Sequence, residues 1–136
     1  EKYGYMMEYA DPAYFDKQLK PALPQVSPAK EELVDRIANL LLGFEKAFDA
    51  RYPALYSKSR PLQGAEAGNV SFHLYAIGEL KTYSQRTLEL YYRQIAGIDP
   101  KDEEHNPSFV IHRTTTAFYG YTSLDDAEAR IRNERQ

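Results

Sequence analysis

Large hydrophobic residues recur every three or four positions through residues 27–50, a period typical of one face of an α-helix. The stripe consists of Leu33, Ile37, Leu40, Leu41, Phe44 and Phe48. The opposite face carries Glu31, Asp35, Arg36, Asn39, Glu45, Lys46 and Asp49. Ser27 can cap the N-terminus, and Pro28 suits the first helical position, where a missing N–H needs no partner. The pattern predicts one long amphipathic helix around which the rest of the chain packs.

Shorter stretches with helical periodicity flank this helix. We expect helices at residues 1–10, between Asp11-Pro12 and Pro21, from Ser71 to about Thr82, from Ser84 to Gly97, and from Ser123 to about Asn133. The last of these should bury Leu124, Ala127 and Ile131 and pair Asp126 with Arg130, and Glu128 with Arg132, on its solvent side. Residues 21–26 hold two prolines and predict an extended connector. Residues 51–70 show no periodicity and predict a long irregular loop.

Residues 108–119 can be read as strand or as helix. Their many β-branched residues favour a strand. Asn106-Pro107, however, makes a good helix start, and Gly120 makes a good end. Four residues would share one helical face, namely Val110, Thr114, Ala117 and Phe118. We therefore expect a helix. The whole chain then reads as all-α, a compact bundle of about six or seven helices with one long irregular loop, in a single domain over residues 1–136.

Composition narrows the classes of partner. The chain has 136 residues, a net charge of −3 and no basic run, so we expect no nucleic-acid partner. No apolar run approaches the roughly 20 residues that cross a bilayer, so we expect no membrane association. There are no cysteines, which excludes disulfides and thiolate chemistry in this span and fits the cytoplasmic location that we expect. The chain begins with Glu1 rather than an initiator methionine, which suggests a fragment lacking N-terminal elements.

The common catalytic signatures are missing from the sequence. The three histidines, His73, His105 and His112, stand in no helical metal-binding spacing, so we expect no metal site. There is no nucleophile elbow and no glycine-rich phosphate loop. The composition is unusual in its 12 tyrosines. They could pack at the margin of the hydrophobic core, or they could line an interface or a ligand cleft with phenol groups.

The strongest candidate site joins the 51–70 loop to the helix that follows it. Glu79 lies one helical turn from Tyr75 and from Tyr83, so the three can share an edge. A half-buried carboxylate beside two phenols could hold a cationic group or act as a general base. An arginine on the loop could bind a carboxylate or phosphate, or simply pair with Glu79. The candidate ligand-binding residues are Arg60, Glu66, His73, Tyr75, Glu79 and Tyr83.

Three runs of sequence resemble the bacterial domain of unknown function family 4125. They are EKYGYMMEYADP at the start, RPLQGAEAG with SFHLYAIGELKTYSQRTLELY in the middle, and FYGYTSLDDAE near the end. The matching positions are Glu1, Lys2, Tyr3, Met6, Met7, Glu8, Arg60, Pro61, Glu66, Tyr75, Gly78, Glu79, Leu80, Tyr83, Ser84, Tyr119, Gly120, Tyr121, Ser123 and Leu124. The resemblance implies a further segment before Glu1. The family has no assigned activity, so the resemblance identifies neither a reaction nor a cofactor, and both stay unknown.

Three functions are compatible with the sequence. The first is a binding or regulatory module with a cleft between the 51–70 loop and the 71–82 helix, taking a small-molecule ligand or a protein partner. The second is an enzyme for a small anionic substrate, with Glu79 as acid or base. The third is a structural domain that forms a homo-oligomer through a tyrosine-rich interface.

Overall fold

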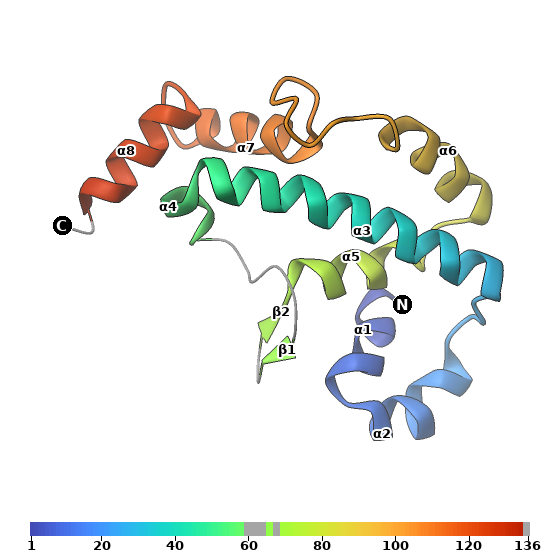
Figure 1. Cartoon of the computed structure of the whole chain (residues 1–136). Helices are drawn as coiled ribbons and strands as arrows, with labels where there is room; N and C mark the ends of the chain where they lie inside the picture. The colour runs from blue at the N-terminus through green and yellow to red at the C-terminus, as the bar shows by residue number, and fades with distance from the viewer. Residues whose placement is uncertain (59–64, 67–68, 135–136) are drawn as a thin grey trace. The chain divides into compact units, whose positions relative to one another are not determined.

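The structure is a computed structural model that describes residues 1–58, 65–66 and 69–134. Its first helices are α1 (Lys2–Ala10), α2 (Pro12–Tyr14), a π-helix (Phe15–Leu19), a 3₁₀-helix (Lys20–Ala22), α3 (Pro28–Arg51) and α4 (Pro53–Tyr56). After them come β1 (Ala65–Glu66), β2 (Asn69–Val70), α5 (Phe72–Leu80), α6 (Gln85–Ile95), α7 (Pro107–Phe118) and α8 (Leu124–Glu134) (Figure 1). The fold is all-α, with eight α-helices in the described part of the chain against the six or seven predicted.

The helix starts follow the polar residues that the sequence marks as caps. Ser71 accepts a hydrogen bond from the Leu74 N–H, and Ser84 accepts one from Thr87. Ser27 and Asp11 do the same at their helices. Each cap satisfies one of the backbone donors that the first turn leaves without a partner. The predicted starts of these helices are therefore confirmed.

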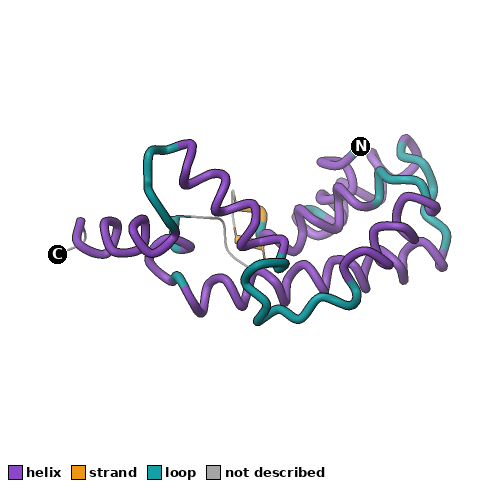
Figure 2. The backbone as a smooth tube through the Cα atoms, turned by 90° about the horizontal axis from the view of Figure 1, so that it is seen from above, coloured by secondary structure: helices purple, strands orange, loops and turns teal. Residues whose placement is uncertain are grey.

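Residues 107–118 form a helix, as predicted, in spite of their β-branched composition. Asn106 caps the start by accepting from the Ser108 N–H. The hydroxyls of Thr114, Thr115 and Thr116 donate to carbonyls one turn earlier, so these side chains remain compatible with a helix. Figure 2 shows that most of the described residues are helical, and the strands among them form one short pair.

Two predictions about irregular segments were wrong in part. The expected 51–70 loop begins with the end of α3, then contains the short helix α4, which Pro53 starts, and the antiparallel pair β1–β2. In the expected connector 21–26, Pro21 lies within the 3₁₀-helix, and extended backbone begins only at Leu23. Proline is tolerated at the first positions of a helix, which is where both prolines stand.

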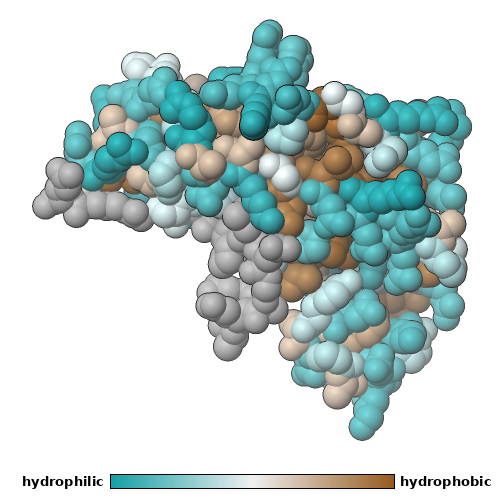
Figure 3. Space-filling model, viewed as in Figure 1, coloured by the Kyte–Doolittle hydropathy of each residue, from teal (hydrophilic) through white to brown (hydrophobic). Residues whose placement is uncertain are grey.

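The described residues form two compact units. Unit 1 comprises residues 1–42 and 61–97, and unit 2 comprises residues 43–60 and 98–136, so helix α3 contributes to both. The buried hydrophobic residues of unit 1 include Tyr5, Met6, Phe15, Val34, Ile37, Ala76, Ile77, Leu80, Leu88 and Ile95. Those of unit 2 include Phe44, Phe48, Tyr52, Tyr56, Phe109, Leu124, Ala127 and Ile131. Hydrophilic residues make up most of the face shown in Figure 3.

The hydrophobic stripe of α3 is partly as predicted. Ile37, Phe44 and Phe48 are fully buried. Leu33, Leu40 and Leu41 are only half-buried, and their places in the core are taken by Val34, Ala38 and Leu42. Val34 and Leu42 directly follow Leu33 and Leu41, and Ala38 directly follows the buried Ile37, so the buried face is rotated toward the next residue in the sequence.

Two glutamates expected on solvent-facing sides are buried. Glu45 on α3 accepts a 2.7 Å hydrogen bond from Ser108 Oγ. Glu128 on α8 accepts hydrogen bonds from the N–H groups of Ala54 and Leu55, at 2.9 and 2.8 Å, and also pairs with Arg132 as predicted. A buried carboxylate is tolerated only when donors surround it, and tertiary contacts supply them here. None of the described helices combines the length and hydropathy that crossing a bilayer requires.

Candidate functional site

Helix α5 carries the predicted site residues on its half-exposed edge. Ala76, Ile77 and Leu80 face the core of unit 1. Tyr75 and Glu79, one turn apart, lie at the margin of that buried face, and Tyr83 follows in the turn after the helix. The Tyr83 hydroxyl donates a 2.8 Å hydrogen bond to Glu79 Oε1. The predicted grouping of a carboxylate with two phenols is therefore present along this edge.

Lys2 of α1 completes the group. Its Nζ donates to Tyr75 Oη at 2.6 Å and lies 4.0 Å from Glu79 Oε2. The same ammonium lies 4.4 Å from the centre of the Tyr75 ring and 5.2 Å from that of Tyr3, within the range of cation–π attraction. The Lys2 and Glu79 side chains are 27% and 39% exposed, so solvent reaches both. We call Lys2, Tyr75, Glu79 and Tyr83 the α5-edge cluster.

Hydrogen bonding raises the pKa of two members of this cluster, Lys2 and Tyr83. The bond to Tyr75, joined by the nearby acidic groups, raises the pKa of Lys2, so its ammonium stays charged. The bond to Glu79, with partial burial, raises the pKa of Tyr83 to about 12. Tyr83 is therefore a neutral hydrogen-bond donor near pH 7. The cluster presents one ammonium, one acceptor carboxylate and two phenols.

The other predicted residues lie elsewhere or outside the described part of the chain. His73 is on α5, but its Nε2 lies 3.2 Å from Asn39 Oδ1 on α3. Glu66 is in β1, and its side chain is not described. Arg60 falls outside the described residues. Of the six candidates, the structure thus brings together Tyr75, Glu79 and Tyr83.

Helical spacing did not predict the part that Lys2 plays, because it stands 73 residues before Tyr75. Only the resemblance to a family pointed to Lys2, because it is one of the matching positions.

The pairing of Lys81 with Glu8 was not predicted from the sequence either. Lys81 is 5% exposed and its Nζ donates to Glu8 Oε2 at 3.2 Å, so a second ion pair joins α5 to α1.

Unit 2 contains a buried polar group of its own, centred on Glu45. Ser108 donates to this carboxylate, and the Tyr56 hydroxyl also hydrogen-bonds to it. Burial, then the bond to Glu45, raises the pKa of Tyr56, whereas burial lowers the pKa of His112. The His112 ring stacks on Phe48 with 4.0 Å between ring centres. Because neutral hydroxyl and ring groups enclose the carboxylate, we regard this group as structural.

Each unit also has a cavity. The one in unit 2 has a volume of about 320 Å³, and five of its lining residues are consecutive, from Tyr121 to Asp125, in the FYGYTSLDDAE motif. Gly120, with φ +89°, turns the chain into that motif. The cavity in unit 1 adjoins Lys81. Among the described residues, no three His, Cys, Asp or Glu side chains come close enough to hold a metal ion.

The fold and the α5-edge cluster define an all-α protein with an amine, a carboxylate and phenols gathered on one helix edge. The chain belongs to the family described as Protein of unknown function (DUF4125), whose model matches residues 1–129. This confirms the resemblance found in the three sequence motifs. No curated protein and no solved structure matches the chain.

Proposed function

We propose that the protein is a helical binding module in which the α5-edge cluster recognises a primary ammonium group on a ligand. The observation that supports this most directly is the position of Lys2. Its ammonium already lies against Tyr75 and Glu79. The edge therefore has the chemistry of a binding site for ammonium groups, which we call the ammonium seat, and the protein's own Lys2 fills it. Carboxylate, phenol oxygen and aromatic face are the groups that bind such cations.

Displacing Lys2 from this seat would cost little. The pair with Glu79 is 4.0 Å long and solvent reaches both side chains. Ion pairs of that kind contribute roughly 0–1 kcal/mol. A ligand ammonium that also gains apolar contact could therefore replace Lys2, while Tyr83 continues to hold the carboxylate. Because Lys2 begins α1, its release also offers a route to regulation.

The test removes the Lys2 side chain by substitution with alanine and adds n-butylammonium, which has the same chemical structure as that side chain, in solution. We expect n-butylammonium to bind the Lys2→Ala variant more tightly than the wild type, by up to about tenfold, which corresponds to 1.4 kcal/mol. NMR shifts of the Tyr75 and Tyr83 rings would report the binding. Glu79→Gln in the Lys2→Ala background should abolish it, and n-butanol should not bind.

Lys101→Ala is the matched control, because Lys101 is exposed and belongs to unit 2. Its response to n-butylammonium should equal that of the wild type. The proposed function fails if Lys2→Ala binds n-butylammonium no more tightly than this control. It also fails if the increased affinity of Lys2→Ala persists when Glu79→Gln is added.

The enzymatic alternative uses the same carboxylate, with Glu79 as acid or base toward a small anionic substrate. The high pKa of Tyr83 argues for binding rather than proton transfer by that phenol, because a neutral phenol near pH 7 donates a hydrogen bond but does not act as a base. Turnover that Glu79→Gln abolishes, with the fold intact, would favour the enzyme.

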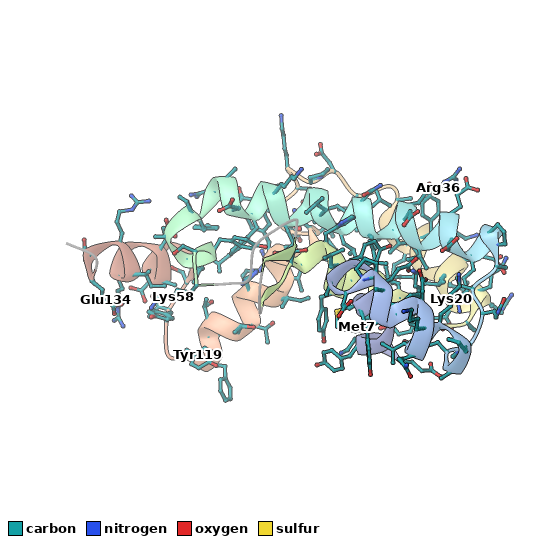
Figure 4. The ribbon with its side chains drawn as sticks, turned by 90° about the horizontal axis from the view of Figure 1, so that it is seen from below. Met7, Lys20, Arg36, Lys58, Tyr119 and Glu134 are labelled. Carbon is teal, nitrogen blue, oxygen red and sulfur yellow. The ribbon has the colours of Figure 1, made fainter. Side chains whose placement is uncertain are left out.

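The structural alternative is self-association through an aromatic surface. The observation in its favour is on α7 and the turn after it, where Phe118 is 85% and Tyr119 72% exposed. Figure 4 labels Tyr119 at the C-terminal end of this helix. Exposed apolar patches often mark contacts between proteins. A dimer in light scattering that Phe118→Ser dissociates would favour this function.

A further inference from the structure

Unit 1 has a solvent-open cavity of about 250 Å³ beside α1, and none of its lining residues belongs to the α5-edge cluster. We call it the Lys81 cavity. Its lining comes from α1, the π-helix, the 3₁₀-helix, the connector at residues 23–26, the start of α3, and Lys81, the residue after α5. Lys20, at the start of the 3₁₀-helix, is labelled in Figure 4.

The buried ammonium of Lys81 is the central feature of this cavity. Lys81 is 5% exposed, and among the described residues its Nζ has one hydrogen-bond acceptor, Glu8 Oε2 at 3.2 Å. The rings of Tyr5 and Tyr9 lie 5.7 Å from it. An ammonium can donate three hydrogen bonds, and burying one that is incompletely paired is costly. A carboxylate placed in the cavity would accept the remaining hydrogen bonds.

The walls of the cavity differ in polarity. Phe15 is buried, and Leu23 and Val26 are half-buried, so these three form an apolar wall. The Tyr5 hydroxyl donates a 2.6 Å hydrogen bond to the Pro24 carbonyl, which holds the connector in place along this wall. The cavity therefore has fixed walls before any ligand arrives, which lowers the entropic cost of binding.

Acidic groups stand nearer the solvent. Glu31 is exposed and the Glu8 side chain is 42% exposed, whereas Lys81 lies inside. With Lys20, the lining carries two positive and two negative side chains. A ligand with no net charge but with both signs keeps this balance. A phosphate or a plain carboxylate would place excess negative charge beside Glu8 and Glu31.

We infer that the Lys81 cavity binds a small zwitterion, namely an α-amino acid with an apolar side chain. Its carboxylate pairs with Lys81, its ammonium with Glu31, because Glu8 already accepts from Lys81, and its side chain packs on Phe15, Leu23 and Val26. The volume fits this class, because about 250 Å³ lies just below the roughly 300–1,000 Å³ of pockets for drug-sized ligands. This inference does not depend on the ammonium seat proposed above.

Three probes of similar shape separate the contributions of the two charged groups. L-leucine carries both charges, leucinamide lacks the carboxylate and 4-methylpentanoate lacks the ammonium. Titrations followed by calorimetry and by backbone NMR should show that L-leucine binds at least tenfold more tightly than either analogue. The shifted resonances should cluster at residues 5–8, 23–31 and 81. Absence of L-leucine binding at millimolar concentration would overturn the inference, and so would equal binding of 4-methylpentanoate.

Variants of the lining test the roles of the charged side chains. Lys81→Met keeps the length of the side chain and should abolish L-leucine binding. Glu31 is exposed, so its substitution should not endanger folding. Glu31→Gln should weaken the binding of L-leucine at least threefold and leave the binding of 4-methylpentanoate unchanged. Lys46→Met, at an exposed position of α3, is the control and should bind as the wild type does. Full binding by a folded Lys81→Met protein would overturn the inference.

If Lys81→Met does not fold, Glu31→Gln and the probe series decide the question by themselves. Glu79→Gln separates this inference from the proposed function. That substitution removes the carboxylate of the ammonium seat and should leave L-leucine binding unchanged. A loss of L-leucine binding in Glu79→Gln would place the amino acid at the α5 edge and not in the Lys81 cavity.

Discussion

Helix α1 packs closely against α5 at Gly78. A Cβ built at this position would lie 2.6 Å from Met6 Cγ and 2.7 Å from the backbone oxygen of Lys2. The methionine side chain could rotate away, but the carbonyl oxygen belongs to the backbone of α1 and cannot. Glycine therefore sets the distance at which Lys2 approaches Tyr75, because the carbonyl that meets Gly78 and the ammonium that meets Tyr75 belong to one residue.

Gly78→Ala should destabilise unit 1 by about 1–3 kcal/mol, because an added methyl group must push α1 away. Urea denaturation would measure the loss. The NMR shift of the Tyr75 ring should change too, since Lys2 moves with α1. Gly97→Ala is the matched control. Nothing lies within 4 Å of a Cβ at that position, so its stability should not fall. Equal stability of Gly78→Ala and the wild type would contradict the close packing.

At the scale of single residues, the sequence reveals neighbours along a helix but not partners across the fold. Tyr75, Glu79 and Tyr83 were predicted together because helical spacing alone brings them together. Lys2 could not be predicted from spacing, because 73 residues separate it from Tyr75. Glu8 and Lys81 are equally far apart, so their pairing depends on how α1 packs on α5.

At the scale of elements, the Glu128 side chain of α8 holds the start of α4. Helix α4 has only four residues, Pro53–Tyr56, and its first residue is a proline. The next two N–H groups, of Ala54 and Leu55, both donate to the Glu128 carboxylate. A negative charge at a helix N-terminus is favourable because of the helix dipole. Lys58 and Glu134, both labelled in Figure 4, form a more exposed ion pair 3.8 Å long at the same pair of helices.

Glu128→Gln should destabilise unit 2 by about 1–3 kcal/mol, because it weakens two buried hydrogen bonds to a charged acceptor. The effect should depend on pH. Burial alone would raise the pKa of Glu128, but the Leu55 and Ala54 N–H groups and Arg132 outweigh it and lower the pKa below its usual 4.5. The wild type's advantage is therefore complete above pH 4.5 and is lost as the pH falls through the folded-state pKa.

Thermal denaturation of both proteins from pH 3 to pH 7 would measure this difference. Glu134→Gln is the control, because its partner is on the surface and such pairs contribute little. An advantage of the wild type that stays constant across this pH range would contradict the role given to the Glu128 carboxylate.

Glu45 and Glu128 also show why helix faces were assigned imperfectly from sequence. Both are charged, so the hydrophobic pattern places them toward solvent. Both are buried because donors from another segment reach them, Ser108 in one case and the N-terminus of α4 in the other. Charge indicates exposure only when no such partner exists, and the partners are 63 and 74 residues away.

At the scale of the whole molecule, the all-α class followed from the sequence because local signals agree with the final fold. For the main helices, the capping residue, the spacing of hydrophobic residues and the residue that ends the helix can be recognised in the sequence without knowing which helices pack against them. The division into two units could not be read in this way. The hydrophobic stripe of α3 continues from Leu41 to Phe44 across the boundary between the units, which falls between Leu42 and Gly43, yet Ile37 lies in the core of unit 1 and Phe48 in that of unit 2.

Gly43 is therefore the residue of α3 at which the chain leaves unit 1 and enters unit 2. Apart from the backbone of α3 itself, no described residue comes within 4 Å of a Cβ at this position, so an alanine fits without displacing a neighbour. Glycine inside a helix costs roughly 0.5–1 kcal/mol relative to alanine, because it loses more backbone freedom on folding. Gly43→Ala should thus stabilise the protein by about that amount. Since α3 supplies core residues to both units, amide exchange should slow in α5 of unit 1 and in α8 of unit 2 alike.

The reverse change in the next turn, Ala47→Gly, is the matched control and should cost a similar amount. Urea denaturation gives the free energy of unfolding, and hydrogen exchange shows which unit responds. Protection that rises in one unit only would mean that α3 does not couple their stabilities. A loss of stability in Gly43→Ala would mean that this side of α3 is more tightly packed than the open space around Gly43 indicates.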